Sequence, residues 1–152
     1  MINVNPSIQQ ARIDTPLGPK IFGLQLPETI FQNCVKLSND VWERKDHISW
    51  NHELVGHMKY QYYVPHSQLK EYGLFDYFYQ CFYWYLIKSS NQIEKRKDNL
   101  IIEIEAFWIN YQEEGEYNPV HNHGQATLSG AIHLREPEYE RTEDRKNEKD
   151  GT

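Results

Sequence analysis

Residues 100–111, LIIEIEAFWINY, alternate between apolar and polar side chains as a half-buried β-strand requires. Ile102 and Ile104 fall on one face of this strand, while Glu103 and Glu105 fall on the other. The pattern predicts a strand over the whole range, with its apolar face turned to a hydrophobic core.

Two further strands are predicted on either side of this one in the sequence. Residues 127–134 place Leu128, Ile132 and Leu134 on one face of an extended backbone. Residues 20–26 form a shorter apolar run and predict a short strand.

Two helices are predicted ahead of residues 100–111. Residues 28–44 follow Pro27 and carry apolar side chains three or four positions apart. Residues 67–90 begin with Ser67 as the expected N-cap and are apolar on most sides. The first helix should therefore be buried against a sheet, and the second against the body of the domain.

The chain of 152 residues is expected to form one domain over residues 19–134. Residues 1–18 predict an irregular N-terminal arm, and residues 135–152 predict a charged loop or tail. Residues 46–66 predict a covering loop, in which four scattered histidines receive no role: His47, His52, His57 and His66.

Composition and charge narrow the class of function. The net charge of −6 argues against a nucleic-acid partner, which a basic surface would attract. No apolar run is long enough for a membrane span, and the first residues lack the pattern of a signal peptide. Cys34 and Cys81 are expected to be buried thiols, and a reducing cytoplasm is the expected location.

Two histidines stand two positions apart between the strands predicted over 100–111 and 127–134. His121 and His123 follow a turn that contains Gly115. On an extended backbone such positions project to the same face, and imidazole is a common ligand of Fe, Zn, Cu and Ni. The pair is therefore the candidate metal site of this chain, and the alternative is two surface histidines in a loop after Pro119.

The sequence around the histidines resembles the core of the 2-oxoglutarate/Fe(II)-dependent dioxygenases. It is most similar to the prolyl-4-hydroxylase-like branch and to the small oxygenases of bacteria and phages. The pieces that carry the resemblance lie in order within residues 100–137: Trp108-Ile109-Asn110, Gly115, His121-Asn122-His123 and Ser129-Gly130.

The resemblance implies an α+β fold with a double-stranded β-helix, a jelly-roll-like barrel supported by N-terminal helices. Residues 19–134 would then be the N-terminal portion of an oxygenase domain. The implied reaction is a hydroxylase-type oxidation of a peptide or small molecule, with Fe(II), 2-oxoglutarate as cosubstrate, and O₂.

The resemblance also implies roles for individual residues. His121 would be the first iron ligand, and His123 would stand where most relatives carry Asp or Glu. Tyr111 and His133 would lie near the distal carboxylate of 2-oxoglutarate, although many relatives have Tyr at the position of His133. Ser129 shares a face with His133 and is a further candidate for the pocket.

The family's third iron ligand and its carboxylate-binding Arg lie on later strands, which would fall beyond residue 152. We therefore expect an incomplete barrel, explained by a truncated or split gene, by a second chain that completes it, or by a shortened fold. His133 is a substitute third ligand if it faces the pair. The alternative function is a non-catalytic barrel-like module that binds a metal or a protein, which 2-oxoglutarate turnover would distinguish.

Overall fold

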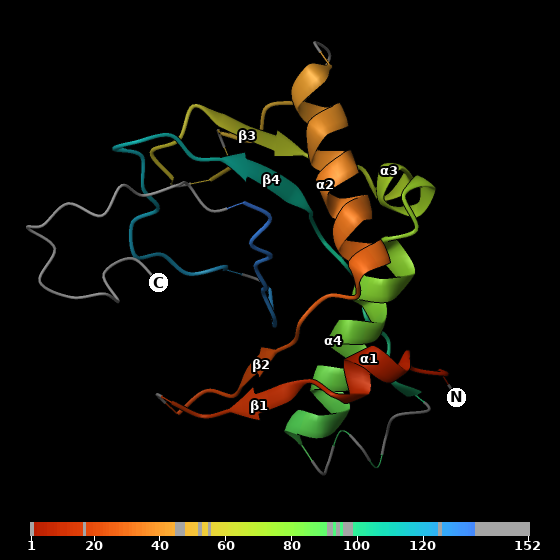
Figure 1. Ribbon diagram of the computed structural model, residues 1–152. Coiled ribbons are helices and arrows are strands. Elements are labelled where there is room, and N and C mark those ends of the chain that lie inside the picture. Colours follow the sequence, from red (N-terminus) through yellow and green to blue (C-terminus); the bar gives the residue numbers. More distant parts are fainter. Residues whose placement is uncertain are drawn as a thin grey trace, which may run out of the picture.

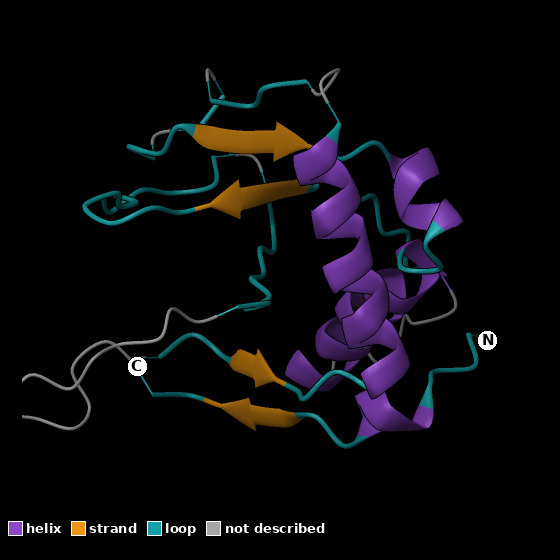
Figure 2. Cartoon of the chain, turned by 45° about the horizontal axis from the view of Figure 1, so that its top comes forward, coloured by secondary structure: helices purple, strands orange, loops and turns teal. Residues whose placement is uncertain are grey.

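The structure is a computed structural model in which helices line one side and two small sheets extend from them (Figure 1). It describes residues 2–16, 18–44, 48–51, 53–54, 56–90, 93, 95, 99–124 and 126–135. The predicted tail from residue 136 onward, and the histidines at 47 and 52, lie outside the described residues. The sheets stand at opposite ends of the helical layer (Figure 2).

Helix α2, Glu28–Glu43, confirms the first predicted helix almost residue for residue. Pro27 is its N-cap, and Glu28 in the first turn interacts favourably with the positive end of the helix dipole. Its buried residues are Cys34, Leu37, Ser38 and Val41. This stripe faces the hydrophobic core, as the spacing of the apolar positions predicts.

The second predicted helix is two helices, α3 (His66–Glu71) and α4 (Phe75–Ser89). Gly73, with φ of +66°, ends α3, and the amide of Leu74 donates to the carbonyl of Leu69 at 2.8 Å. This is a Schellman cap, which satisfies the free carbonyls at a helix end and turns the chain. The predicted N-cap at Ser67 is also wrong, because α3 begins one residue earlier, after Pro65.

Strands β3 (Tyr60–Tyr63) and β4 (Trp108–Tyr111) pair in antiparallel register, with Gln61 opposite Asn110. The prediction of a covering loop over 46–66 therefore missed β3. The strand predicted over 100–111 is confirmed only in its last four residues, because no described strand pairs with residues 100–107.

The predicted irregular arm contains a short helix and one strand of a hairpin. Helix α1, Pro6–Gln9, is capped by the Asn5 side chain, which accepts from the amide of Ser7. Strand β1, Arg12–Asp14, pairs antiparallel with β2, Ile21–Gly23. The arm is thus part of the fold, and the strand predicted over 20–26 is present in shorter form.

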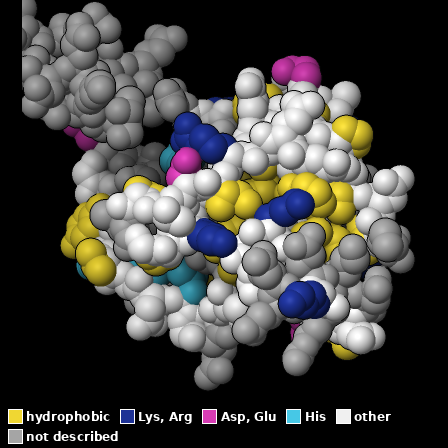
Figure 3. Space-filling view, turned by 90° about the horizontal axis from the view of Figure 1, so that it is seen from below, with side chains coloured by type: hydrophobic (Ala, Val, Ile, Leu, Met, Phe, Trp, Pro, Cys, Tyr) yellow, Lys and Arg dark blue, Asp and Glu magenta, His cyan; other side chains and the backbone are white. Residues whose placement is uncertain are grey.

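The surface on the side of this hairpin combines apolar groups with lysine and arginine side chains (Figure 3). Lys20 Nζ donates to the carbonyl of Ser89, and Lys88 Nζ lies 4.7 Å from the ring centre of Trp84. Tyr85 donates its hydroxyl to the carbonyl of Lys20 at 2.9 Å. The long lysine side chains therefore cover aromatic surface of α4 while their charges reach solvent.

Residues 127–134, predicted as a strand, belong to no strand of the described part of the chain. Leu134 packs against the core cluster, and the Arg135 guanidinium donates to the Asn39 side chain of α2. The described residues thus form a mixed helix–sheet fold with two two-stranded sheets, neither of them closed. The double-stranded β-helix remains a prediction.

The hydrophobic core lies between the helices and the inner side of the β3–β4 sheet. Ile8, Val41, Val64 and Leu69 are fully buried within it. Phe78 of α4 stacks on Phe107, their ring centres 5.3 Å apart. None of the described helices is long and apolar enough to cross a membrane.

Candidate metal centre

The two faces of the β3–β4 sheet have different surroundings. Tyr60, Tyr62 and Tyr111 lie on the side of α2, where the Trp42 ring centre is 5.2 Å from Tyr60 and 4.8 Å from Tyr111. Alternation along a strand sends Gln61 and Trp108 to the opposite face. The candidate metal centre lies on this second face.

The loop after β4 brings the two predicted ligands together. The ring centres of His121 and His123 are 5.0 Å apart, with 61° between the ring planes. Two imidazoles that share one ion at about 2.1 Å from each nitrogen place their ring centres roughly 5 Å apart. Both side chains are exposed, so an ion from solvent can reach them.

A backbone contact fixes the tautomer of His121. Its Nδ1 lies 2.8 Å from the carbonyl oxygen of Pro119. Because a carbonyl only accepts hydrogen bonds, Nδ1 carries the hydrogen and Nε2 of the neutral ring keeps its lone pair. Metal-binding histidines commonly have such a partner, which orients the ring and leaves the other nitrogen for the ion.

His123 is oriented by strand β4 rather than by its own loop. Its ring stacks on the indole of Trp108, with centres 6.2 Å apart and 29° between the planes. Trp108 is the first residue of β4. The sheet therefore provides a rigid surface for one member of the pair.

A third protein ligand does not stand beside the pair among the described residues. No group of three or more His, Cys, Asp or Glu side chains within the described ranges is arranged to hold a metal. His133, considered as a substitute third ligand, belongs to no such group, so that hypothesis is wrong for the described chain. The pair alone offers two ligands.

The residues predicted to contact 2-oxoglutarate have different environments. Ser129 and His133 are both exposed. Tyr111 is half-buried, and its hydroxyl donates to the backbone carbonyl of Ser38 at 2.5 Å. Burial is the main cause that raises the pKa of Tyr111. In this structure its hydroxyl is thus engaged by α2.

Comparisons with known proteins give no relative for this chain. No model of a protein family, no curated protein and no solved structure matches it.

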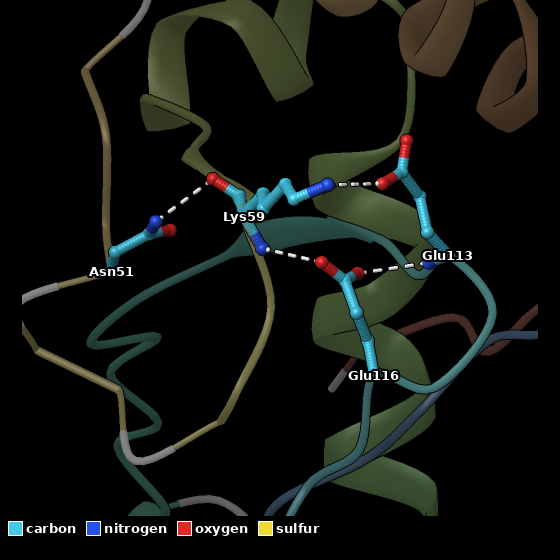
Figure 4. Close-up of polar contacts among 4 residues, drawn as sticks. All are labelled: Asn51, Lys59, Glu113 and Glu116. Atoms are coloured by element: carbon cyan, nitrogen blue, oxygen red, sulfur yellow. Dashed lines mark hydrogen bonds and ion pairs between the residues drawn. The ribbon is translucent and has the colours of Figure 1, made fainter.

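Sequence reasoning missed the segment that anchors the histidine loop (Figure 4). The Glu116 carboxylate accepts from the Lys59 amide at 3.0 Å and from the Glu113 amide at 2.8 Å. These backbone donors lower the pKa of Glu116, the Glu113 amide contributing most. Lys59 Nζ in turn donates to Glu113 Oε2 at 2.8 Å, and this bond raises the pKa of Lys59.

His57, which received no role from the sequence, also contacts this part of the histidine loop. Its backbone amide donates to the Tyr117 carbonyl at 2.9 Å, and its ring stacks on Tyr117 with centres 4.9 Å apart. Nothing in the local sequence reveals this contact, because the partners are about sixty positions apart. The only available signal is the opposite charge of Lys59 and the acidic turn at 113–116.

Proposed function

We propose that this chain carries the metal-binding part of a 2-oxoglutarate- and Fe(II)-dependent oxygenase. The observation that supports this most directly is the pair of exposed imidazoles, His121 and His123, with ring centres 5.0 Å apart. The resemblance of residues 100–137 to that family supplies the reaction class.

The two imidazole ligands are of a kind that binds iron, but an iron site of this type needs a third protein ligand. Neutral imidazole nitrogens bind Fe(II), Zn(II) and related ions, and the Pro119 carbonyl prepares one of them. Iron oxygenases of this type hold the ion through three protein ligands on one face. We propose that the third ligand comes from the remainder of the barrel, in a longer product of the gene or in a second chain.

The residues of this chain have separate tasks in the proposed reaction. Fe(II), with 2-oxoglutarate and O₂, supplies the oxidation of an unreactive C–H bond when it is bound. His121 and His123 hold the ion, and Trp108 keeps the His123 ring in place. The proposed substrate is a peptide or a small molecule, and the proposed setting is the cytoplasm.

The alternative proposal is a module that binds a metal or a protein without catalysis. The observation that favours it is that the described residues supply two ligands and not three. Only the oxygenase releases succinate from 2-oxoglutarate. Succinate formation with Fe(II), by this chain joined to the proposed remainder of the barrel, therefore separates the two functions. Loss of 2-oxoglutarate turnover together with retained metal binding would support the module.

Metal binding itself is tested by titration of the native chain and single variants with Co(II), a spectroscopic substitute for Fe(II). We expect His121→Ala and His123→Ala to lose Co(II) binding while their far-UV circular dichroism stays native, because both side chains are exposed. His133→Ala, which changes another exposed histidine, is the matched control and should bind as the native chain does. Native affinity in His121→Ala would contradict the proposal.

A further inference from the structure

The loop that carries the histidines has few contacts at the histidines themselves. Val120, His121 and Asn122 are exposed, and the loop contains two glycines with left-handed backbone, Gly115 and Gly124. An exposed loop of this kind keeps the two imidazole rings at a fixed separation only if contacts with other segments of the protein hold it in place. The contacts that fix it therefore control the metal centre.

Glu116 is the first fixed point of the loop. Its two carboxylate oxygens accept from different segments, Oε1 from the Lys59 amide and Oε2 from the Glu113 amide. Its own carbonyl accepts from the Gln112 side chain at 2.6 Å. One carboxylate thus closes the turn after β4 and ties it to the segment before β3.

Further contacts extend this attachment toward the histidines. The amide of His57 donates to the Tyr117 carbonyl, and the two rings stack with 21° between their planes. At the next position, Asn118 packs so closely on Gly56 that a β-carbon at 56 would overlap Asn118 Oδ1. Residues 56–59 and 113–118 therefore form a continuous contact, which we name the loop anchor.

His121 lies between the loop anchor and a second fixed point, which is His123 itself. The anchor ends at Asn118, and the stack of His123 on Trp108 fixes the other end. Only four residues separate these points, and His121 is one of them. The backbone between the two points cannot shift freely, so the anchor limits how far the two imidazoles can move apart.

We infer that Glu116 is a positioning residue that sets the affinity of the histidine pair for its metal. Its side chain is not a ligand and acts through the backbone of the loop. A site whose ligands are already placed loses less conformational freedom when the ion binds. The inference rests on the proposed function, since it requires that the pair binds a metal.

The test compares Glu116→Ala, Glu116→Gln and Glu114→Ala in Co(II) titrations of the folded chain. We expect Glu116→Ala to bind Co(II) about tenfold more weakly, the lower end of the usual effect of outer residues on metal affinity. Glu116→Gln keeps one acceptor oxygen and should restore part of the affinity. Glu114 lies in the same turn and is exposed, so Glu114→Ala is the matched control and should bind normally.

A second measurement separates positioning from a general loss of structure. Hydrogen exchange of the amides in residues 112–124 should become faster in Glu116→Ala, while exchange in α2 and α4 stays native. Native Co(II) affinity in Glu116→Ala would overturn this inference alone. Failure of the native chain to bind Co(II) would overturn both this inference and the proposed function.

Discussion

The phenolic oxygen of Tyr111 connects β4 to α2. It donates to the carbonyl of Ser38 in α2, and the Ser38 hydroxyl lies 3.4 Å from it. Ser38 is a buried residue of α2, so removal of the tyrosine hydroxyl takes a hydrogen-bond donor from a carbonyl in a mostly buried place. A residue expected at the cosubstrate from its place in the sequence pattern is engaged here by the supporting helix.

Tyr111→Phe should therefore lower the free energy of unfolding by about 1 kcal/mol, the usual value of one buried hydrogen bond. Urea denaturation followed by circular dichroism measures the change. Tyr79→Phe, which alters a half-buried tyrosine on α4, is the control and should be close to neutral. A loss of 2-oxoglutarate affinity in Tyr111→Phe at unchanged stability would instead support the predicted cosubstrate contact.

Among the elements, those with a strong local pattern were predictable and those made by distant pairing were not. Helix α2 has both a start signal and an apolar stripe, and its observed bounds agree with the prediction. Strand β3 is rich in tyrosine on both faces, and only its pairing with β4, far along the chain, shows that it is a strand. The stop at Gly73 is readable in retrospect, because a glycine inside an apolar helix is a common cap.

In the candidate metal centre, too, contacts between neighbours in the sequence were predictable and contacts between distant residues were not. His121 and His123 are close in sequence, so their spacing was enough to predict that they lie together. The loop anchor joins residues more than fifty positions apart, as the bond from Lys59 to Glu116 illustrates. Such contacts depend on the register of the sheet, which no local pattern of side chains reveals.

Substitution of the glycine between α3 and α4 should be costly. Gly73→Ala forces a β-carbon into a left-handed backbone, with an expected loss of roughly 1–2 kcal/mol of stability. The cause is conformational, since the nearest atom to that β-carbon would be Asn33 Nδ2 at 4.0 Å. Thermal unfolding measures it, with Gly23→Ala in β2 as the control, where φ is not positive and the β-carbon meets nothing. Equal stability of the two variants would contradict this reading.

At the scale of the whole molecule, burial makes the fold sensitive to alkaline pH. Desolvation raises the pKa of Cys34 to about 11 and that of Cys81 to about 12. The folded state therefore keeps protons that the unfolded thiols lose from about pH 8.5 upward. The hydrogen bond to Asp40 raises the pKa of Tyr72, and burial raises the pKa of Tyr77 and of Tyr111, so these groups add to the decrease above about pH 10.

The free energy of unfolding should thus be constant near neutral pH and decrease as the pH rises above about 8.5. Each group binds more protons when folded, so its contribution is fully present below the unfolded pKa and is lost toward the folded one. Denaturation curves between pH 7 and 10 measure the decrease. In a Cys34→Ala/Cys81→Ala variant, the decrease between about pH 8.5 and 10 should be absent. The same decrease of the unfolding free energy with pH in that variant would exclude the thiols as the cause.

Because Trp108 stacks on His123, its fluorescence should respond to changes at the candidate metal centre. Indole emission is sensitive to a protonated imidazole or a paramagnetic ion next to the ring, and Trp108 is in direct contact with one member of the pair. The other indoles, at positions 42, 50 and 84, pack against tyrosine rings or beneath a lysine side chain. Occupancy of the metal centre can therefore be followed by intrinsic fluorescence, without a label.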